Sequence, residues 1–545
     1  MKTFETDVIV IGGGATGTGT LRDCTLRGMK GILIEKNDIA SGTTGRNHGL
    51  LHSGARYAVK DLESASECIS ENKILKKIAW HCIEDTGGLF VTLPEDDPAY
   101  HNMLIEGCSY AGIDADEISI NKALEIEPNL NPNILYALKV PDGTIDPFRL
   151  SAANILDSME RGSKVFTHTD VTSLILENGT VAGVRCYDKA SHEEFEVYGK
   201  IVVNASGVWG QQVCESAGIE LKMFPSKGSM VIIDYRINNV VVNRCRIPSD
   251  GDIIVPGDTV SLIGTTSRKI DYDRIEELVV DDDEIEVLLE DGEKLIPNVK
   301  KTRVLRAYCG VRPLVAVSGE MEGRDISRGI VLIDHNERDG VEGLITIAGG
   351  KLMTYRLMAQ MTTDLVGKKL GVKKKCTTHR VPLPGSEKRI PHQKKIKYFS
   401  GISNSVVGST HYRHGERVHT ILRKDKKNYG LICECEMVTA GEVEYAIKHL
   451  NVKDIVDLRR RTRVGMGPCQ GELCSYRAAG LFTEYGDKDG NESTRLLMEF
   501  LEERWKGIKP VFWGDAMREI EFTYWIYQGL FGLGNIENNK GESDR

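Results

Sequence analysis

Asp7-Val-Ile-Val-Ile-Gly-Gly-Gly-Ala-Thr-Gly17 is the stretch that decides the fold of this 545-residue chain. Residues 8–11 are apolar and β-branched, which is typical of a buried parallel strand. The glycine turn that follows leads into a helical stretch, residues 18–27, and Gly28 stands where a helix C-terminal glycine is expected. A second apolar strand, residues 32–34, ends on Glu35. Strand, glycine turn, helix, strand and terminal acid in this order predict a dinucleotide-binding βαβ unit.

Each part of this unit has a mechanical reason. Gly12 permits the tight turn, Gly14 lets the backbone approach a pyrophosphate, and Gly17 lets the helix pack closely on the strand. The helix N-terminus offers free N–H groups to phosphates, and Glu35 accepts both ribose hydroxyls. The predicted contacts in this region also include Ala15, Thr16 and Lys36.

The segment after the second strand favours FAD over NAD. Residues 40–57 are rich in Gly, Ser and Thr, so their amides and hydroxyls suit the length of an extended cofactor. A nicotinamide enzyme more often continues into a further βαβ unit. The predicted FAD contacts here are Ser41, Thr44, Gly45, Asn47, His48, Gly49 and Leu50.

Two later segments are expected to return to the cofactor. Residues 201–209 form an apolar strand that ends in small residues, and residues 345–356 read as strand, Gly-Gly, then helix N-terminus. Between them and the first unit, residues 165–183 predict a hairpin with Asn178-Gly179 at its turn. The predicted contacts from these segments are Val171, Ala205, Gly207, Gly349, Gly350, Lys351, Leu352, Met353 and Thr354.

Three cations in these cofactor segments predict an anionic substrate. They are Arg56, Arg312 and Lys351, and guanidinium groups suit phosphate or carboxylate. Tyr57 is placed to hydrogen-bond the same ligand. Oxidation of an alcohol also needs a base for the hydroxyl proton, for which His52 and His48 are the candidates.

Four cysteines near the C-terminus predict a metal centre. Cys433 and Cys435 form a Cys-x-Cys pair, and Cys469 and Cys474 form a Cys-x4-Cys pair. Two such pairs suit a [2Fe–2S] cluster, with tetrahedral zinc as the alternative, since four cysteines alone do not choose the metal. With iron, a flavin would collect electrons in pairs and the cluster would pass them on singly.

The whole chain excludes several classes of protein. Its net charge of −9 argues against nucleic-acid binding. No apolar run approaches the roughly 20 residues that span a bilayer. The strand near the N-terminus leaves no room for a signal peptide, and thirteen cysteines without one fit a reducing compartment, so we expect a cytoplasmic protein.

We expect an oxidoreductase region at 1–380, a linker at 381–430, the cysteine module at 431–485 and a helical tail at 486–545. The acid-rich stretch 281–293 is interpreted as a solvated face. The basic run 459–463 is interpreted first as a solvated face, with docking of an acidic electron-transfer partner or compensation of the cluster charge as alternatives.

Several longer motifs carry a family resemblance. Residues 47–57, 310–314 and 349–355 resemble the flavin-dependent glycerol-3-phosphate dehydrogenases, and the cysteine module resembles the bacterioferritin-associated-ferredoxin type of [2Fe–2S] domain. Together with residues 459–467 and 503–507, they resemble the large-subunit family of the anaerobic glycerol-3-phosphate dehydrogenases over essentially the whole chain.

The resemblance implies a fold, an activity and partners. The fold would be α/β plus α+β: a Rossmann-type FAD-binding domain of the amino-acid-oxidase or glutathione-reductase type, an interleaved antiparallel-sheet substrate domain and a small helical iron–sulfur module. The family oxidises sn-glycerol 3-phosphate to dihydroxyacetone phosphate on FAD. It passes electrons through a B subunit, in which FMN is expected, and a membrane-anchoring iron–sulfur C subunit to quinone, so the chain would lie at the inner face of the membrane.

Carried over by motif, Arg56, Arg312 and Lys351 would hold the substrate, with Tyr57 beside them. Aerobic relatives have a histidine where this chain has Met230, so no role of that histidine transfers. An FAD-dependent amino-acid or 2-hydroxy-acid dehydrogenase is the alternative activity. A third hypothesis is an electron-relay subunit whose flavin meets no substrate.

Overall fold

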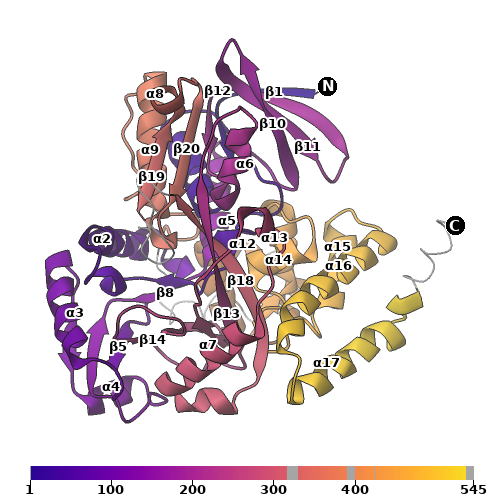
Figure 1. Ribbon diagram of the computed structural model, residues 1–545. Coiled ribbons are helices and arrows are strands. Elements are labelled where there is room, and N and C mark those ends of the chain that lie inside the picture. The colour runs from indigo at the N-terminus through magenta and orange to yellow at the C-terminus, as the bar shows by residue number, and fades with distance from the viewer. Residues whose placement is uncertain (1, 316–328, 389–398, 400, 424, 536–545) are drawn as a thin grey trace.

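The computed structural model describes residues 2–315, 329–388, 399, 401–423 and 425–535. Figure 1 shows three parts: a domain around a parallel sheet at the top, a domain around a second sheet below it, and a helical C-terminal module on the right.

The first domain is built on a parallel sheet with the strand order β9-β2-β1-β12-β20. Side chains of β1 alternate between two cores: Val8 and Val10 pack in one, Ile9 and Ile11 in the other. The antiparallel strand β19 (Ile330–Asp334) pairs with β20. The parallel strands are β1 (Lys2–Ile11), β2 (Gly31–Ile34), β9 (Lys164–Phe166), β12 (Glu193–Asn204) and β20 (Leu344–Gly349).

Three helices pack together beside this sheet: α1 (Ala15–Leu26) contacts both α5 (Pro147–Glu160) and α9 (Tyr355–Leu370). Helix α1 starts three residues earlier than the sequence predicted. Gly28 has φ +88°, as expected for a glycine that ends a helix.

The predicted hairpin is confirmed. Strands β10 (Thr169–Glu177) and β11 (Thr180–Asp188) pair antiparallel and extend the sheet beyond β12. Asn178 and Gly179 both have positive φ, +51° and +81°, as a tight two-residue hairpin turn requires.

The second domain is built on a nine-stranded, mostly antiparallel sheet. Its strands come from residues 88–140 and 223–315, so the chain leaves and re-enters the first domain between them. Strand β18 pairs along β13. In spatial order the strands are β17 (Arg268–Lys269), β13 (Met223–Ile233), β16 (Val260–Gly264), β15 (Ile253–Gly257), β14 (Val241–Arg244), β5 (Gly88–Thr92), β7 (Tyr136–Val140) and β6 (Asp116–Ile118), with β18 (Val304–Val315) beside β13.

Short elements connect the two sheets. A three-stranded sheet of β3 (Leu50–Leu51), β8 (Gly143–Ile145) and β4 (Ile83–Glu84) lies between them in the chain path. The remaining helices of these two domains are α2 (Leu62–Ile78), α3 (Pro98–Ala111), α4 (Ile120–Ile126), α6 (Gly210–Glu215), α7 (Asp282–Leu295) and α8 (His335–Asp339).

Helix α7 agrees with the interpretation of the acid-rich stretch as a solvated face for most of its acids, because Asp282, Asp283, Glu286 and Glu290 are exposed. Glu284 is the exception: it is fully buried and pairs with Lys227 at 2.8 Å. Its carboxylate also accepts hydrogen bonds from Ser229 and Thr266. This one acid can be buried because a cation and two hydroxyls satisfy it.

The C-terminal module is helical, as predicted. Thr439 and Glu442 form the expected capping box at the start of α13. The module contains β21 (Leu431–Cys433), β22 (Val438–Thr439), α13 (Ala440–His449), α14 (Ile455–Thr462), α15 (Ser475–Tyr485), α16 (Gly490–Ile508) and α17 (Asp515–Trp525). No described helix combines the length and the apolar character needed to cross a membrane.

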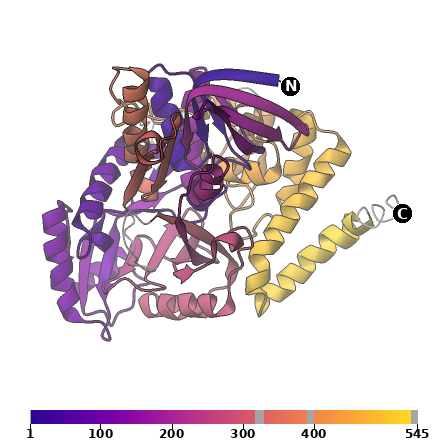
Figure 2. The ribbon, with the colours of Figure 1, turned by 45° about the horizontal axis from the view of Figure 1, so that its top comes forward.

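The stretch predicted as a linker is largely folded. It contains α11 (Asn404–His414) and α12 (Val418–Arg423), and Val407 and Ile421 pack in the same core as the cysteine module. Residues 389–398 of that linker, and 536–545 of the predicted tail, lie outside the described residues. Figure 2 shows α16 and α17 at the outer edge of the molecule.

Candidate active site and metal centre

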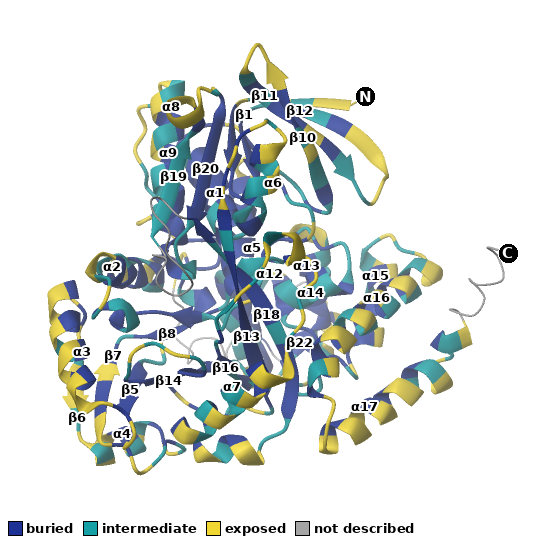
Figure 3. Cartoon of the chain, in the orientation of Figure 1, coloured by how far each residue is buried: buried dark blue, intermediate teal, exposed yellow. Residues whose placement is uncertain are grey.

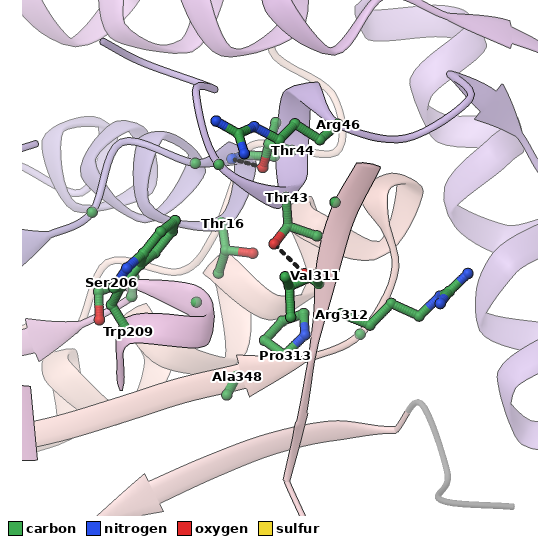
Figure 4. A pocket seen from close by; sticks show the side chains of 18 of the residues that line it. Thr16, Thr43, Thr44, Arg46, Ser206, Trp209, Val311, Arg312, Pro313 and Ala348 are labelled. Atoms are coloured by element: carbon green, nitrogen blue, oxygen red, sulfur yellow. Dashed lines mark hydrogen bonds between the residues drawn. The ribbon is translucent and has the colours of Figure 1, made fainter. Parts of the chain in front are cut away.

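The predicted cofactor segments line one cavity of about 500 Å³. They come from the turn after β1, the end of β2, the 41–48 segment, the turn after β12, the middle of β18 and the turn after β20. Figure 4 shows Ser206 and Trp209 on one side of this cavity and Arg312 on the other, with Thr43 donating a hydrogen bond to the carbonyl of Val311 between them. The cavity joins both large domains.

The glycine turn has the close contacts that its sequence requires. Gly12 has φ +107°, and a Cβ there would lie 2.5 Å from the Ala205 carbonyl oxygen. A Cβ on Gly17 would lie 2.0 Å from the Gly12 carbonyl oxygen, so no side chain fits between α1 and the turn. The amide of Ala15 donates to the Thr44 hydroxyl at 3.0 Å, which joins the turn to the second cofactor segment.

Glu35 lies at the end of β2 and lines the cavity, as predicted. Its carboxylate accepts hydrogen bonds from the amides of Gly13 at 2.6 Å and Asn37 at 2.8 Å. Burial raises the pKa of Glu35, although these two hydrogen bonds oppose the shift. The carboxylate is therefore fixed beside the glycine turn, where a ribose would lie.

Most of the predicted contacts line the cavity, and five do not. Gly17, Gly45, Gly49 and Thr354 support the lining residues from behind. Thr354, for example, accepts a hydrogen bond from the Lys351 amide at 3.0 Å. The fifth is Arg56, whose guanidinium donates to the buried carboxylate of Asp252 at 2.8 Å.

One end of the cavity gathers the predicted substrate residues. The Lys351 ammonium lies 4.6 Å from the centre of the Tyr57 ring, and its buried Nζ has no hydrogen-bond partner among the described residues. The His52 ring lies 5.6 Å from the Tyr57 ring and 5.8 Å from the His48 ring. An ammonium group without a hydrogen bond is costly to bury, so this position suits an anionic ligand.

Arg312, on β18, also lines the cavity. Its guanidinium donates to the Thr265 hydroxyl at 2.8 Å and the Thr266 carbonyl at 2.9 Å. It packs so closely on Gly228 that a Cβ there would lie 2.5 Å from its Nη2. The guanidinium is thus held in one orientation. Met230 also lines the cavity.

The four predicted metal ligands meet in the C-terminal module. Each thiol contacts two others, in the ring order Cys433, Cys435, Cys469, Cys474. These contacts lower the pKa of Cys433 and Cys469 and raise the pKa of Cys435 and Cys474. The four thiols are therefore close enough to titrate together, as the ligands of one centre would.

The arrangement is a ring and not a tetrahedron. Zinc–sulfur bonds of about 2.3 Å would place all four sulfurs roughly 3.8 Å from one another. In the described part of the chain, only one group of three or more possible ligands has all its ligand atoms within 4.8 Å of one another. That group is His168, Asp454 and Asp457, not the cysteines. Two adjacent irons fit the ring better than a single zinc ion.

Backbone amides and two glycines shape this centre. The amide of Gly465 donates to Cys433, and that of Gly471 to Cys469. Both glycines have positive φ, and a Cβ on either would lie within 2.8 Å of the Phe500 ring. Amides aimed at the sulfurs are a feature that tunes iron–sulfur centres.

Comparisons with known proteins agree with both sites. Residues 7–356 match the family model described as FAD dependent oxidoreductase, and residues 431–484 match that of the BFD-like [2Fe-2S] binding domain. The A subunit of the anaerobic glycerol-3-phosphate dehydrogenase of Escherichia coli (strain K12) is 56% identical over 98% of each chain. The A1 subunit of the Haloferax volcanii enzyme is 40% identical over 95% of this chain and 89% of its own.

This chain belongs to the family of A subunits of the anaerobic glycerol-3-phosphate dehydrogenases. The glycerol-3-phosphate dehydrogenase from Bacillus halodurans, solved with FAD, shares the fold, with a TM-score of 0.69 at 24% identity over 94% of this chain and 97% of that one. The glycine oxidase of Geobacillus kaustophilus, with a TM-score of 0.54 at 20% identity, covers 71% of this chain and all of its own. The predicted fold class and cofactors, FAD and a [2Fe–2S] cluster, are confirmed.

Two buried arginines, Arg306 on β18 and Arg504 on α16, lie beside the loop that bears Cys469. Arg504 donates to the carbonyl of Gln470 at 3.1 Å, and Arg306 to its side-chain oxygen at 3.3 Å. Burial lowers the pKa of both arginines, so neighbouring carboxylates do not fully compensate their charges. The negative charge of a cluster held by four thiolates, beginning at the adjacent Cys469, would complete the balance.

The basic run 459–463 overturns the interpretation that the sequence favoured. Arg461 is fully buried and forms two hydrogen bonds with Asp38 of the FAD domain, at 2.5 and 3.0 Å, and Arg460 donates to the same carboxylate. Arg463 pairs with Asp258 at 2.5 Å. The run therefore lies at the contact between the cysteine module and the rest of the chain. We call the contact of Arg460 and Arg461 with Asp38 the Asp38 seam. The side chains of Arg460, Arg461 and Arg463 neither form a solvated face nor lie free to dock a partner.

Sequence reasoning also missed residues of the cavity. Trp209 lines it and donates to Glu276 at 2.5 Å, while Lys36 lies 4.8 Å from the Trp209 ring. Thr43 and Ser206 line it as well. These residues could have been found from the sequence, because each is a polar or aromatic residue close to a predicted glycine turn.

Proposed function

We propose that this chain oxidises sn-glycerol 3-phosphate to dihydroxyacetone phosphate. The observation that carries the proposal is the buried Lys351 ammonium, which has no hydrogen-bond partner among the described residues and lies beside Tyr57, in the cavity that Arg312 also lines. A phosphate dianion would satisfy both cations. The names of the relatives give the same substrate.

The proposed roles follow from these positions. Lys351 and Arg312 bind the phosphate and hydroxyl region, and Tyr57 hydrogen-bonds the same ligand. His52, which is 8% exposed, takes the hydroxyl proton as the carbon–hydrogen bond breaks, with His48 as the second candidate. FAD, when bound, accepts the hydride. Arg56 acts indirectly. Its guanidinium pairs with Asp252 and so holds the loop that contains Asp252 in place.

The electrons then leave through the [2Fe–2S] cluster. We propose that they pass to a B subunit, in which FMN would reside, and through a membrane-anchoring C subunit to quinone. The chain would then lie at the inner face of the membrane through these partners. The word subunit in the names of the relatives supports a multi-subunit complex.

Anaerobic stopped-flow reduction of the bound flavin tests the activity. We expect glycerol 3-phosphate to bleach the flavin, and lactate and amino acids to leave it oxidised. Arg312→Ala should abolish bleaching with FAD retained, whereas Arg185→Ala should not, because Arg185 is exposed and pairs with Glu196 at the surface. Reduction by a hydroxy acid but not by glycerol 3-phosphate would establish the alternative dehydrogenase, and no reduction by either would favour the electron-relay hypothesis.

A further inference from the structure

We propose that the exposed aromatic surface at the C-terminus is the docking site for the protein that takes electrons from the cluster. The proposal rests on the electron exit proposed above. We call this surface the exit face and define it as Leu473, Tyr476, Phe522, Trp525, Leu530 and Phe531.

The exit face begins at the cluster. Cys433 and Cys474 are each 1% exposed, but Cys435 and Cys469 are only partly buried, so one edge of the centre is open toward solvent. Leu473, next to Cys474, is 48% exposed, and Tyr476, two residues further, is 40% exposed. Because electron transfer weakens steeply with distance, an acceptor must approach where the cluster is closest to the surface.

The chain end extends this surface. The Tyr527 hydroxyl is bonded to the Ser475 hydroxyl at 2.7 Å and donates to the Glu472 carbonyl at 2.5 Å, which fixes residues 526–530 on the cluster loop. The Phe531 ring then lies 5.5 Å from the Tyr476 ring. The last described turns are therefore held against the loop that bears Cys469 and Cys474.

Helix α17 exposes large apolar side chains that no other described part of the molecule covers. Its buried residues are Ala516, Ile520 and Thr523. Phe522 is 65% exposed and Trp525 60%, and Leu530 just beyond the helix is 79% exposed. Figure 3 shows α17 exposed along most of its length. Contiguous exposed apolar surface of this kind marks an interaction site.

The charges identify a protein as the occupant and disfavour a lipid surface. Helices that lie on membranes carry Lys and Arg beside their aromatic residues. Helix α17 carries three acids and one base, Asp515, Glu519, Glu521 and Arg518, and Glu519 pairs with Arg303 of the substrate domain. Anionic headgroups would be repelled. Exposed Trp, Tyr and Phe side chains are the residues that anchor protein interfaces.

Binding measurements with a double variant of the exit face test the proposal. Phe522→Asp/Leu530→Asp changes side chains that are mostly exposed, so folding and cofactor content should be unchanged. We expect it to bind the purified B subunit, the proposed electron acceptor, about tenfold or more weakly than the unmodified chain does. Cluster reduction by glycerol 3-phosphate, followed by electron paramagnetic resonance, should stay the same. Tyr110→Asp, at an 81% exposed position on α3, is the matched control.

The outcomes separate this proposal from the proposed function. Unchanged B-subunit binding by the double variant overturns the exit face, as does failure of the unmodified chain to bind the B subunit. Loss of binding to phosphatidylcholine–phosphatidylglycerol vesicles, with subunit binding retained, would assign the surface to the membrane instead. Failure of glycerol 3-phosphate to reduce the unmodified chain would contradict the activity alone.

Discussion

Removing Asp38 should weaken the contact between the cysteine module and the FAD domain. Its carboxylate is 1% exposed and accepts hydrogen bonds from Arg461, which is fully buried, and from Arg460. Burial opposes ionisation of Asp38, but the charges of Arg461 and Arg460 outweigh it and lower its pKa. Asp38→Ala would leave the Arg461 guanidinium buried without its counter-charge. Breaking a buried pair in this way costs about 3–5 kcal/mol.

The measurement is urea unfolding of the holoprotein, followed by visible circular dichroism of the cluster and by flavin fluorescence. We expect the cluster signal of Asp38→Ala to be lost at lower urea, with about 3–5 kcal/mol less unfolding free energy. Flavin reduction by substrate should survive, while electron transfer from flavin to cluster slows. Glu125→Ala is the control, because Glu125 and its partner Lys122 are 67% and 58% exposed. A loss no larger than that of this control would refute the seam.

Local geometry makes three further outcomes testable. Gly17→Ala should abolish FAD binding in flavin-content assays, whereas Gly480→Ala, a helical glycine with nothing within 4 Å of the new methyl, should not. Burial and nearby carboxylates raise the pKa of Asp457 to about 7, and its hydrogen bond raises that of His168 despite burial. Between about pH 4 and pH 7 the folded chain then binds more protons than the unfolded one, so the unfolding free energy should fall as the pH rises across that range, and Asp457→Asn should flatten that slope. Arg504→Gln removes a buried positive charge beside the cysteine loop, so redox titration should give a lower cluster potential.

The sequence predicts the cofactor sites well because their signals are local. The positive φ of Gly12, +107°, and the close spacing of cysteines within each of the two pairs can both be inferred from a few adjacent residues. The strand–turn–helix order then fixes which end of the sheet the cavity occupies. The predicted FAD contacts therefore line the cavity or lie directly behind it.

Residues that depend on distant partners could not be interpreted in the same way. The composition of the arginine run 459–463 is the same whether it faces water or a carboxylate, and the partner Asp38 precedes Arg461 by 423 residues. Glu284, on helix α7, is likewise satisfied by Lys227 on strand β13, and Arg56 by Asp252. Whether a charge is buried is a property of the assembled fold, which a local pattern does not contain.

Strand β18 explains how one chain keeps two redox centres at a constant spacing. Val311 and Arg312 line the FAD cavity, while Arg306 on the same strand donates to Gln470 beside Cys469. Arg306 and Val311 are about five residues of strand apart, which is roughly 17 Å at about 3.3 Å per residue. Between them, the Tyr308 hydroxyl donates to the Asn47 carbonyl of the cofactor segment at 2.9 Å. A continuous hydrogen-bonded strand therefore fixes the cavity that would hold FAD relative to the cysteines that would hold the cluster, and the Asp38 seam is a second contact between the module and the FAD domain. The two attachments are independent, so loss of the seam should slow electron transfer without abolishing it.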